Sequence, residues 1–302
     1  MSSAPLQLYR ARYWPTWLLI GTLKLITLLP FEMQLGLGRL LGRTFMRIGK
    51  SRRHITEVNL RLCFPELGQA ERQQLLVRTF EAQGMGLMET AAAWLMPPAA
   101  LLPRVELSGL EAVAEAQRQG RPVLLLGGHY TTLDLSGTLL GHFLTVDVIF
   151  RRQKNPVINH MMDQGRQKYL QGGRTFSQKD MREVYRSLAE KRVLWYPPDQ
   201  DYGAKHSVFA PFFGVPAAVI KAPTRMAKKY NAAVFACWSH RTPDARYQLH
   251  IEPLEDFTAN DYEADATAIN RALEHAIRQY PEQYMWVHRR FKSRPPGSPK
   301  VY

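Results

Sequence analysis

The sequence has few cysteines and no metal-binding pattern, and each shortage excludes a class of protein. Its two cysteines, Cys63 and Cys237, lie far apart and form no CxxC pair, which excludes a disulfide framework and indicates a reducing compartment. The nine histidines form neither an HxxxH pair nor a Cys/His cluster at zinc-ligand spacing. Helix-turn-helix, RNP and zinc-finger patterns are also missing. We therefore expect neither a metal cofactor nor a nucleic-acid partner.

Acidic residues are also scarce relative to basic ones. The 302 residues include 40 Lys and Arg but only 26 Asp and Glu, a formal net charge of +14. An excess of this size favours nucleic acid, anionic lipid or an acidic protein as a partner, and charge alone does not choose among them. Hydrophobic residues make up 45% of a chain without low-complexity tracts, so it can bury a substantial core.

The N-terminal region contains an apolar run that is short for a membrane span. Trp14 to Leu29 is almost wholly apolar, whereas a spanning helix needs roughly 20 residues. Extended to Leu37 the run reaches that length, with Lys24 snorkelling or facing protein. No small-x-small cleavage site follows the run, so we expect an uncleaved membrane anchor.

Two stripes on the next segment predict an amphipathic helix. The basic stripe and the apolar stripe share a spacing of 4, 4 and 3 residues. Their members are Arg39, Arg43, Arg47 and Lys50, and Leu37, Leu41, Phe45 and Ile48. Such a helix either lies on an anionic bilayer or covers the core, and the neighbouring apolar run favours the bilayer. Basic residues are denser after this run than before it, which places the rest of the chain in the cytoplasm.

From residue 122 onward, short apolar runs alternate with segments of helical periodicity. Predicted strands are Val123–Leu126, Val146–Phe150, Val193–Tyr196, Ala232–Trp238 and Tyr247–Ile251. Predicted helices are Leu133–Leu140, Pro156–Leu170, Met181–Lys191, Ala217–Tyr230 and Asp265–Gln279. This alternation predicts an α/β fold with a mostly parallel central sheet covered by helices, and a ligand site beyond the carboxyl ends of its strands. The mostly helical region before residue 110 predicts an N-terminal helical cap.

A His–Asp motif follows the first of these strands. His129 comes directly after Gly127 and Gly128, and Asp134 lies five residues further on. A neutral imidazole can take the proton of an alcohol as that alcohol attacks a thioester, while a carboxylate at the other ring nitrogen holds the tautomer. A histidine bonded for structure at a strand end, with Asp134 opening a helix, explains the same pattern equally well.

At this motif the chain resembles the lysophospholipid acyltransferase superfamily, whose signature is HxxxxD or HxxxxE. Further segments resemble the late acyltransferases of lipid A biosynthesis, and the resemblance runs from about residue 10 to the C-terminus. They are Arg52–Arg53 with Asn59–Leu60 and Cys63–Pro65, Phe150–Arg152 with Asn155–Pro156, Trp195–Gly203, and Pro281–Lys292. We expect a membrane anchor with an amphipathic basic helix at 1–50 and an acyltransferase domain at 51–302.

The family resemblance implies a donor, an acceptor and a location. The donor is acyl carrier protein carrying an acyl thioester, and the acceptor is a Kdo-lipid IVA-type disaccharide that is acylated on a 3-hydroxyacyl chain. The lauroyl-type members suggest a lauroyl group. The enzyme needs no cofactor, forms no covalent acyl-enzyme, and acts at the bacterial inner membrane with its catalytic domain on the cytoplasmic side.

The resemblance also suggests roles for individual residues. His129 matches the general base and Asp134 its partner, although many lauroyl-type members have Glu at the second position. Arg166 matches a functionally important arginine, which we expect to bind a phosphate or lie near the thioester. Asp199 matches an important acid, which we expect to organise the site by pairing with Arg166. Basic candidates for contacting the acceptor or the carrier protein are Arg151, Arg152, Lys154, Arg289, Arg290 and Lys292.

Two other functions remain open at this point. One is a glycerolipid acyltransferase of the same superfamily, acting on lysophosphatidic acid or glycerol phosphate; the Pro281–Lys292 segment argues against it. The other is a non-catalytic basic protein that binds membrane or nucleic acid.

Overall fold

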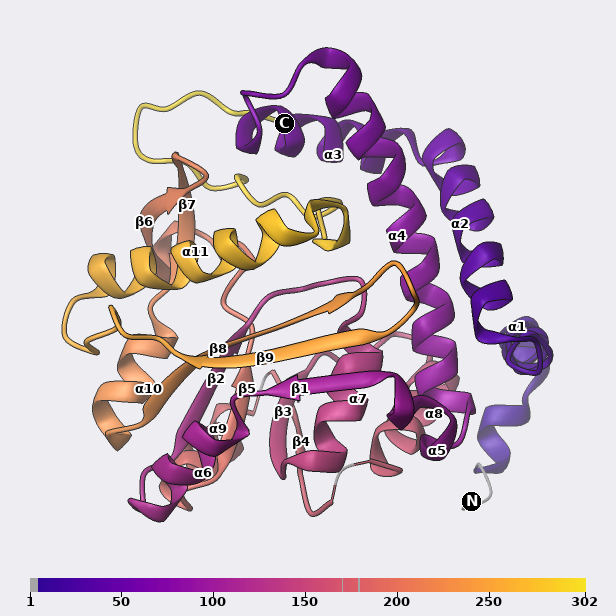
Figure 1. The fold of residues 1–302 in the computed structure, drawn as a ribbon, viewed down its shortest axis with the longest axis horizontal. Coiled ribbons are helices and arrows are strands. Elements are labelled where there is room, and N and C mark those ends of the chain that lie inside the picture. The colour runs from indigo at the N-terminus through magenta and orange to yellow at the C-terminus, as the bar shows by residue number, and fades with distance from the viewer. Residues whose placement is uncertain (1–4, 170, 179) are drawn as a thin grey trace.

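The computed structural model describes residues 5–169, 171–178 and 180–302, and its centre is a seven-stranded sheet (Figure 1). The strand order is β1-β9-β8-β2-β5-β3-β4. All neighbouring pairs are parallel except β8 and β9, which are antiparallel. The strands are β1 (Val105–Ser108), β2 (Val123–Gly127), β3 (Val146–Phe150), β4 (Thr175–Ser177), β5 (Val193–Tyr196), β8 (Ala233–Arg241) and β9 (Tyr247–Pro253). The predicted α/β class with a mostly parallel sheet is confirmed.

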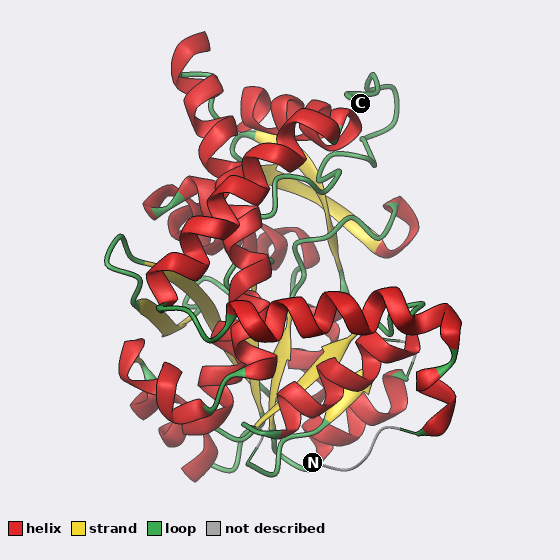
Figure 2. Cartoon of the chain, turned by 90° about the vertical axis from the view of Figure 1, so that its right-hand side faces the viewer, coloured by secondary structure: helices red, strands yellow, loops and turns green. Residues whose placement is uncertain are grey.

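Helices cover both faces of this sheet, and Figure 2 shows the strands between them. One face packs against α9 (Met181–Ala189), α10 (Ala222–Tyr230) and α11 (Tyr262–Gln279). The other packs against α6 (Leu110–Arg118), α7 (Leu133–Phe143) and the long helix α4 (Gln69–Leu95). α8 (Pro156–Gln167) packs on α4 beside α7.

Strand β2 lies in the middle of the sheet and is buried throughout. Leu124 and Leu126 belong to the core under α9, α10 and α11, whereas Val123 and Leu125 belong to the core under α6 and α7. A strand that is buried on both faces must be apolar at every position, which explains the continuous Val-Leu-Leu-Leu run. In register, Val123 pairs with Val193 of β5 and with Ala233 of β8.

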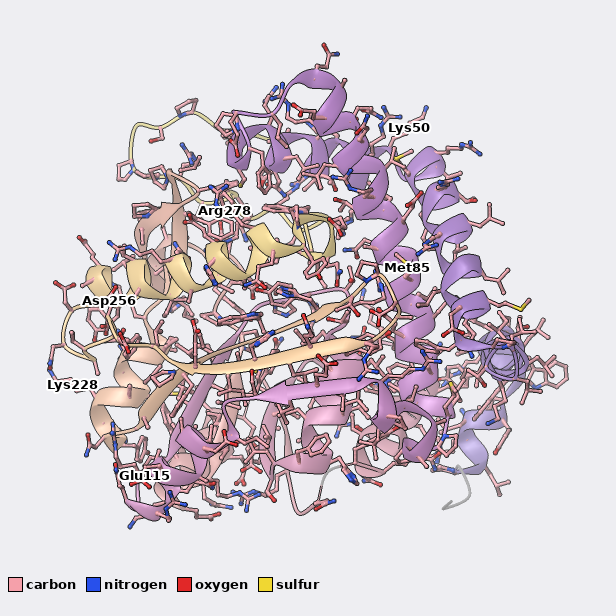
Figure 3. The ribbon with its side chains drawn as sticks, in the orientation of Figure 1. Lys50, Met85, Glu115, Lys228, Asp256 and Arg278 are labelled. Carbon is pink, nitrogen blue, oxygen red and sulfur yellow. The ribbon has the colours of Figure 1, made fainter. Side chains whose placement is uncertain are left out.

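The N-terminal helices pack closely against α4. α2 (Phe31–Ile48) runs beside α4, and α3 (Lys50–Cys63) follows it after Gly49 (Figure 1). A β-carbon added at Gly42 would lie 2.0 Å from the carbonyl oxygen of Phe80, so glycine allows the two backbones to touch. Met85, labelled on α4 in Figure 3, is buried near this contact. The boundary proposed at residue 50 falls at the joint between α2 and α3, and the division into two domains stays a prediction.

The prediction of one continuous membrane-spanning helix is wrong, because the segment forms two separate helices. α1 (Trp14–Ile26) has 13 residues, and α2 begins at Phe31. Pro30 lies between them, and proline disfavours helical backbone at the residue before it. Within the described residues, every helix is too short or too polar to cross a membrane. Lys24 faces protein, because its ammonium group donates to the carbonyl oxygen of Leu95 at 2.9 Å.

A hairpin replaces part of one predicted helix. β6 (Ser207–Phe212) and β7 (Val215–Ile220) pair antiparallel, so the first residues of the predicted helix Ala217–Tyr230 lie in a strand. Pro223 lies in the first turn of α10, where its missing N–H costs no hydrogen bond. The predicted helix Pro156–Leu170 ends at Gln167 as α8, and Leu170 lies outside the described residues. The remaining short helices are η1 (Leu6–Tyr9), η2 (Ala11–Tyr13), α5 (Pro98–Leu101), η3 (Leu102–Arg104), η4 (Ala204–His206) and η5 (Pro281–Gln283).

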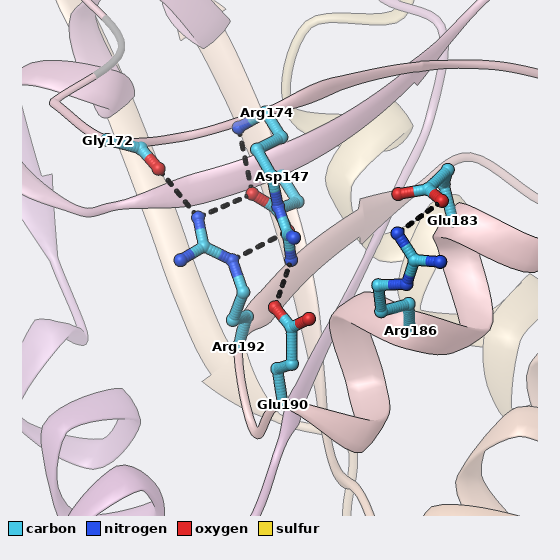
Figure 4. A network of polar contacts seen from close by, with 7 residues as sticks. All are labelled: Asp147, Gly172, Arg174, Glu183, Arg186, Glu190 and Arg192. Carbon is cyan, nitrogen blue, oxygen red and sulfur yellow. Dashed lines mark hydrogen bonds and ion pairs between the residues drawn. The ribbon is translucent and has the colours of Figure 1, made fainter.

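A buried carboxylate joins three strands near their amino ends. Asp147 of β3 binds Arg192, which precedes β5, at 2.7 Å and Arg174, which precedes β4, at 3.0 Å (Figure 4). Burial opposes the charge of Asp147, but the hydrogen bonds from both arginines outweigh it and lower the pKa of its carboxyl group. This network fixes the edge of the sheet opposite to the carboxyl ends of the strands.

Candidate active site

The site forms where two neighbouring parallel strands end. His129 follows β2 and Asp199 follows β5, and the carboxyl ends of parallel neighbours meet at one edge of a sheet. The two glycines before His129 are closely packed by side chains. A β-carbon at Gly127 would lie 2.6 Å from the indole nitrogen of Trp195, and one at Gly128 would lie 2.8 Å from the Leu273 side chain.

His129 and Asp199 form the central pair. The Nδ1 atom of His129 lies 2.6 Å from Oδ1 of Asp199, and the backbone N–H of His129 donates to Oδ2 at 2.8 Å. Tyr284 donates its hydroxyl hydrogen to the same Oδ2 at 3.0 Å. Asp199 is only 2% exposed, and both of its oxygens are bonded. The carboxylate therefore holds the imidazole ring and its backbone in one orientation.

The expected partners of the two acids are exchanged. Asp134 was expected to pair with His129, but it binds Arg166 of α8, with 2.9 Å between the guanidinium nitrogen and Oδ1. Asp199, which was expected to pair with Arg166, holds His129 instead. The physical reason is direction, because Asp134 lies in the first turn of α7 and reaches across to the neighbouring helix. The Asp134–Arg166 pair is partly exposed, at 25% and 22% of the two side chains.

Electrostatics favour an ionised Asp199 beside His129. Burial alone would lower the pKa of His129, but the charge and the hydrogen bond of Asp199 outweigh it and raise that pKa above 6.5. Burial alone would raise the pKa of Asp199, but the charge and hydrogen bonds of His129 lower it to about 2. Since an ionised carboxylate can only accept hydrogen bonds, we assign the hydrogen of neutral His129 to Nδ1.

The other ring nitrogen of His129 is then the basic atom. Its Nε2 atom lies 3.2 Å from the side-chain nitrogen of Gln200, which we assign as the donor to the Nε2 lone pair. A substrate hydroxyl that donates to Nε2 must displace this amide. The arrangement can therefore act as a general base on an alcohol, in the manner of a His–Asp pair without its serine.

An apolar cavity of about 360 Å³ opens beside His129. Asp134, Arg166 and Arg151 contribute charged side chains to its lining. Its apolar lining includes Trp94, Leu133, Leu140, Val146, Val148, Ile158, Met162 and Trp195. A cavity with apolar walls and a few convergent polar groups suits a ligand with a long hydrocarbon part and a reactive polar end.

The predicted basic residues differ in their surroundings. Arg151 and Arg152 are both exposed, and Arg151 also lines the cavity, whereas Arg152 lies 5.9 Å from the ring centre of Phe150. Arg290 is only 1% exposed and donates to the carbonyl oxygen of Ala218. The prediction that Arg290 contacts the acceptor or the carrier protein is therefore wrong.

Asp201 has a separate task from Asp199. It accepts hydrogen bonds from the backbone N–H of Ser293 at 2.6 Å and from the Ser293 hydroxyl at 2.8 Å. The two aspartates of the Asp-Gln-Asp sequence therefore face different partners, His129 and Ser293.

Sequence reasoning missed the role of the Pro281–Lys292 segment, which holds the His129 loop in place. Met285 donates its backbone N–H to the carbonyl oxygen of His129 at 3.0 Å, and Thr131 donates to Gln283 at 2.8 Å. Asn59 of α3 donates to the carbonyl oxygen of Trp286 at 2.7 Å. The signal that could have located this role was the close family match of the segment itself. Gln200 carried no separate signal.

Comparison with known proteins identifies the family of this site. The family described as bacterial lipid A biosynthesis acyltransferase matches residues 5–293. The lipid A biosynthesis lauroyltransferase of Escherichia coli (strain K12) is 38% identical, over 98% of this chain and 97% of that protein. The palmitoleoyltransferase of the same organism is 32% identical, over 96% and 95%, and its myristoyltransferase is 30% identical, over 96% and 91%. The chain therefore belongs to the bacterial lipid A biosynthesis acyltransferases and is an enzyme.

Proposed function

We propose that this enzyme transfers a lauroyl group from acyl carrier protein to a 3-hydroxyacyl hydroxyl of a Kdo-lipid IVA-type acceptor. The observation that carries the proposal is the His129–Asp199 pair, whose ring borders an apolar cavity. The relative that is 38% identical is named a lauroyltransferase, which supports the choice of chain. No cofactor enters the reaction, because both the activated acyl group and the hydroxyl come from substrates.

The reaction proceeds by direct transfer. The acceptor hydroxyl displaces Gln200 and donates to Nε2 of His129. Its oxygen forms a bond to the thioester carbonyl carbon while its proton moves to Nε2, and Asp199 stabilises the resulting imidazolium. The tetrahedral intermediate then breaks its carbon–sulfur bond, and the leaving thiolate takes the proton from His129. The products are the ester and the free thiol of the carrier protein, and His129 is neutral again.

The charged groups at the cavity suit the substrates. Arg166 lies at the cavity with its guanidinium held by Asp134, and Arg151 and Arg152 are exposed nearby. Guanidinium groups bind phosphate and carboxylate groups through paired hydrogen bonds. We assign Arg166 to a phosphate of the acceptor or to the thioester region. Arg151 and Arg152 are assigned to anionic groups of the acceptor or to the acidic carrier protein.

We further propose that α1 and α2 attach the enzyme to the cytoplasmic surface of an anionic inner membrane. Large apolar side chains are exposed along both helices and the turn between them. They are Trp14, Leu18, Leu19, Leu25, Leu28, Leu29, Met33, Leu37, Leu40, Phe45 and Ile48. Arg39, Arg43 and Arg47 lie on the same helix α2. Apolar side chains beside basic ones are typical of a helix that lies in the membrane interface.

An acyl-transfer assay tests the reaction. Purified enzyme in detergent receives lauroyl- and myristoyl-acyl carrier protein, with Kdo2-lipid IVA and lysophosphatidic acid as competing acceptors, and products are identified by mass spectrometry. We expect one lauroyl group on the disaccharide and no product with His129→Ala. Acylation of lysophosphatidic acid alone would assign the enzyme to glycerolipids, and full activity of His129→Ala would refute the base.

Vesicle flotation tests the membrane proposal. The enzyme should bind vesicles that contain phosphatidylglycerol more strongly than vesicles of phosphatidylcholine alone. A Leu37→Glu, Leu40→Glu double variant should lose most of this binding, because two apolar contacts are replaced by like charges against an anionic surface. Tyr262→Glu, which changes an exposed side chain of α11, is the matched control. Equal binding by all three proteins would contradict the proposal.

A further inference from the structure

A cleft between α7 and α8 forms the inner part of the cavity. Both helices pack against α4. Leu133, Gly137 and Leu140 of α7 line one side of this cleft. Ile158 and Met162 of α8 line the other side, and Val146, Val148 and Trp195 of the sheet form its floor. Because α7 begins beside the His129 turn and runs to Phe143, Leu140 lies further from the reacting end than Asp134 does.

Gly137 is the position where the wall of α7 has no side chain. A β-carbon added there would meet nothing within 4 Å, although the residue lines the cavity. The glycines at 127 and 128 differ, because neighbouring atoms already occupy the space where their side chains would lie. Glycine in the interior of a helix is less stable than alanine, and the open space gives no packing reason for it here. Gly137 is itself exposed, so the space beside its backbone is open.

We propose that Gly137 sets the length of acyl chain that the enzyme accepts, by leaving the middle of the cleft open. This inference rests on the proposed acyl transfer and names a specificity determinant for it. Gly137 lines the cavity from α7, between Asp134 at the start of that helix and Leu140 near its end, so a side chain there would take up part of the cleft. A long chain would then lose its place in the cleft, whereas a short chain would end before the obstruction. One methylene in an apolar pocket changes kcat/KM by about tenfold or more.

Chain-length profiles of two variants test the proposal. Wild type, Gly137→Ala and Gly137→Leu receive equimolar acyl carrier proteins with chains of 8, 10, 12 and 14 carbons, and the products are counted by mass spectrometry. For Gly137→Leu we expect the ratio of the longest to the shortest transferred chain to fall at least tenfold, with the shortest chain transferred within a few-fold of wild type. Gly137→Ala should move the ratio in the same direction by a smaller factor. A thermal unfolding measurement checks that this variant is folded.

Gly36→Leu is the matched control. Gly36 lies in the interior of α2, and an added β-carbon there also meets nothing within 4 Å, but Gly36 is outside the cavity. Its length profile should equal that of wild type.

Several results would overturn the inference. These are an unchanged profile in both Gly137 variants, an equal loss for every chain length, or a rise in acceptor KM alone, which would assign the cleft to a chain of the acceptor. If Gly137→Leu is inactive, an unchanged profile in Gly137→Ala overturns the inference equally. Failure of the proposed function is distinct, because wild type would then transfer no acyl chain to the disaccharide acceptor.

Discussion

Replacement of Asp199 by Asn separates the two possible partners of His129. Asn keeps the size of the side chain but removes its charge, and its amide group donates where the carboxylate accepted. The bond of 2.6 Å to Nδ1 of His129 would then favour the tautomer that carries its hydrogen on Nε2. That tautomer has no lone pair toward the substrate. In a serine protease the equivalent change lowers kcat by roughly 10⁴-fold, and we expect a loss of about 10²- to 10⁴-fold here.

The pH dependence of kcat/KM provides the second part of this prediction. A general base must be unprotonated, so kcat/KM should rise with pH through the pKa of His129, which Asp199 raises above 6.5. Without the carboxylate, only burial remains as a large cause, and burial lowers the pKa of an imidazole. The acidic limb of Asp199→Asn should therefore move to lower pH, although the plateau is much lower than that of wild type.

Asp134→Asn is the comparison that can refute this reasoning. Its carboxylate binds Arg166, so its loss should release that guanidinium and raise substrate KM, while the acidic limb stays in place. The assay is the initial rate of acyl transfer between pH 5 and 9, the range about the ordinary histidine pKa. If Asp134→Asn moved the limb and Asp199→Asn left it unchanged, His129 would be coupled to Asp134, and the exchange of partners seen in the structure would be irrelevant to the reaction.

Three other substitutions have expected outcomes of known sign. Gln200→Ala removes a donor to the neutral form of His129, so the acidic limb of the rate profile should move to higher pH by roughly half a unit to one unit. Glu89→Gln leaves Arg241 buried without its ion pair of 2.6 Å, which should cost about 3–5 kcal/mol in denaturant unfolding. Gly42→Ala places a methyl group 2.0 Å from a carbonyl oxygen of α4, which should cost about 1–3 kcal/mol and lower the Tm.

Two control substitutions distinguish these specific effects from the general effect of changing a residue. Asp256→Asn breaks an ion pair whose side chains are 69% and 71% exposed, and it should leave stability nearly unchanged. Gly36→Ala has open space around the new methyl group and should raise the Tm slightly, because alanine favours helix. If Gly36→Ala lowered the stability as much as Gly42→Ala, the contact with α4 would not be the cause of the stability lost in Gly42→Ala.

The sequence predicted the placement of His129 because the signals there are local. A continuous apolar run marks β2, and two glycines mark the turn that follows it. His129 comes directly after these glycines. The pairing of His129 with Asp199 is long-range, since it depends on β5 lying next to β2 in the sheet. The family motif suggested Asp134 as the partner of His129. Spacing along the chain does not show in which direction a side chain at the start of a helix points.

The wrong predictions elsewhere have similar causes. Counting hydrophobic residues extends the apolar run from Trp14 through Pro30. The first helix instead ends at Ile26 and α2 begins at Phe31, and Pro30 between them disfavours helical backbone at Leu29. The predicted helix Ala217–Tyr230 merged a strand with a helix, because a short run of buried residues fits either periodicity. Its pairing with β6 decided for the strand, and that contact is invisible in a local window.

The family match at Pro281–Lys292 has a physical explanation that differs from substrate contact. Tyr284 bonds to Asp199, Met285 bonds to the backbone of His129, and Asn59 binds the carbonyl oxygens of Trp286 and His288. The segment thus connects the loop after β2, the loop after β5 and helix α3, and it contacts both members of the pair. The hydrogen bond between His129 and Asp199 requires two separate loops to be held within a fraction of an ångström, and no single strand can supply that. A segment that crosses both loops can, so the residues of Pro281–Lys292 lie behind the reacting groups rather than in the lining of the cavity.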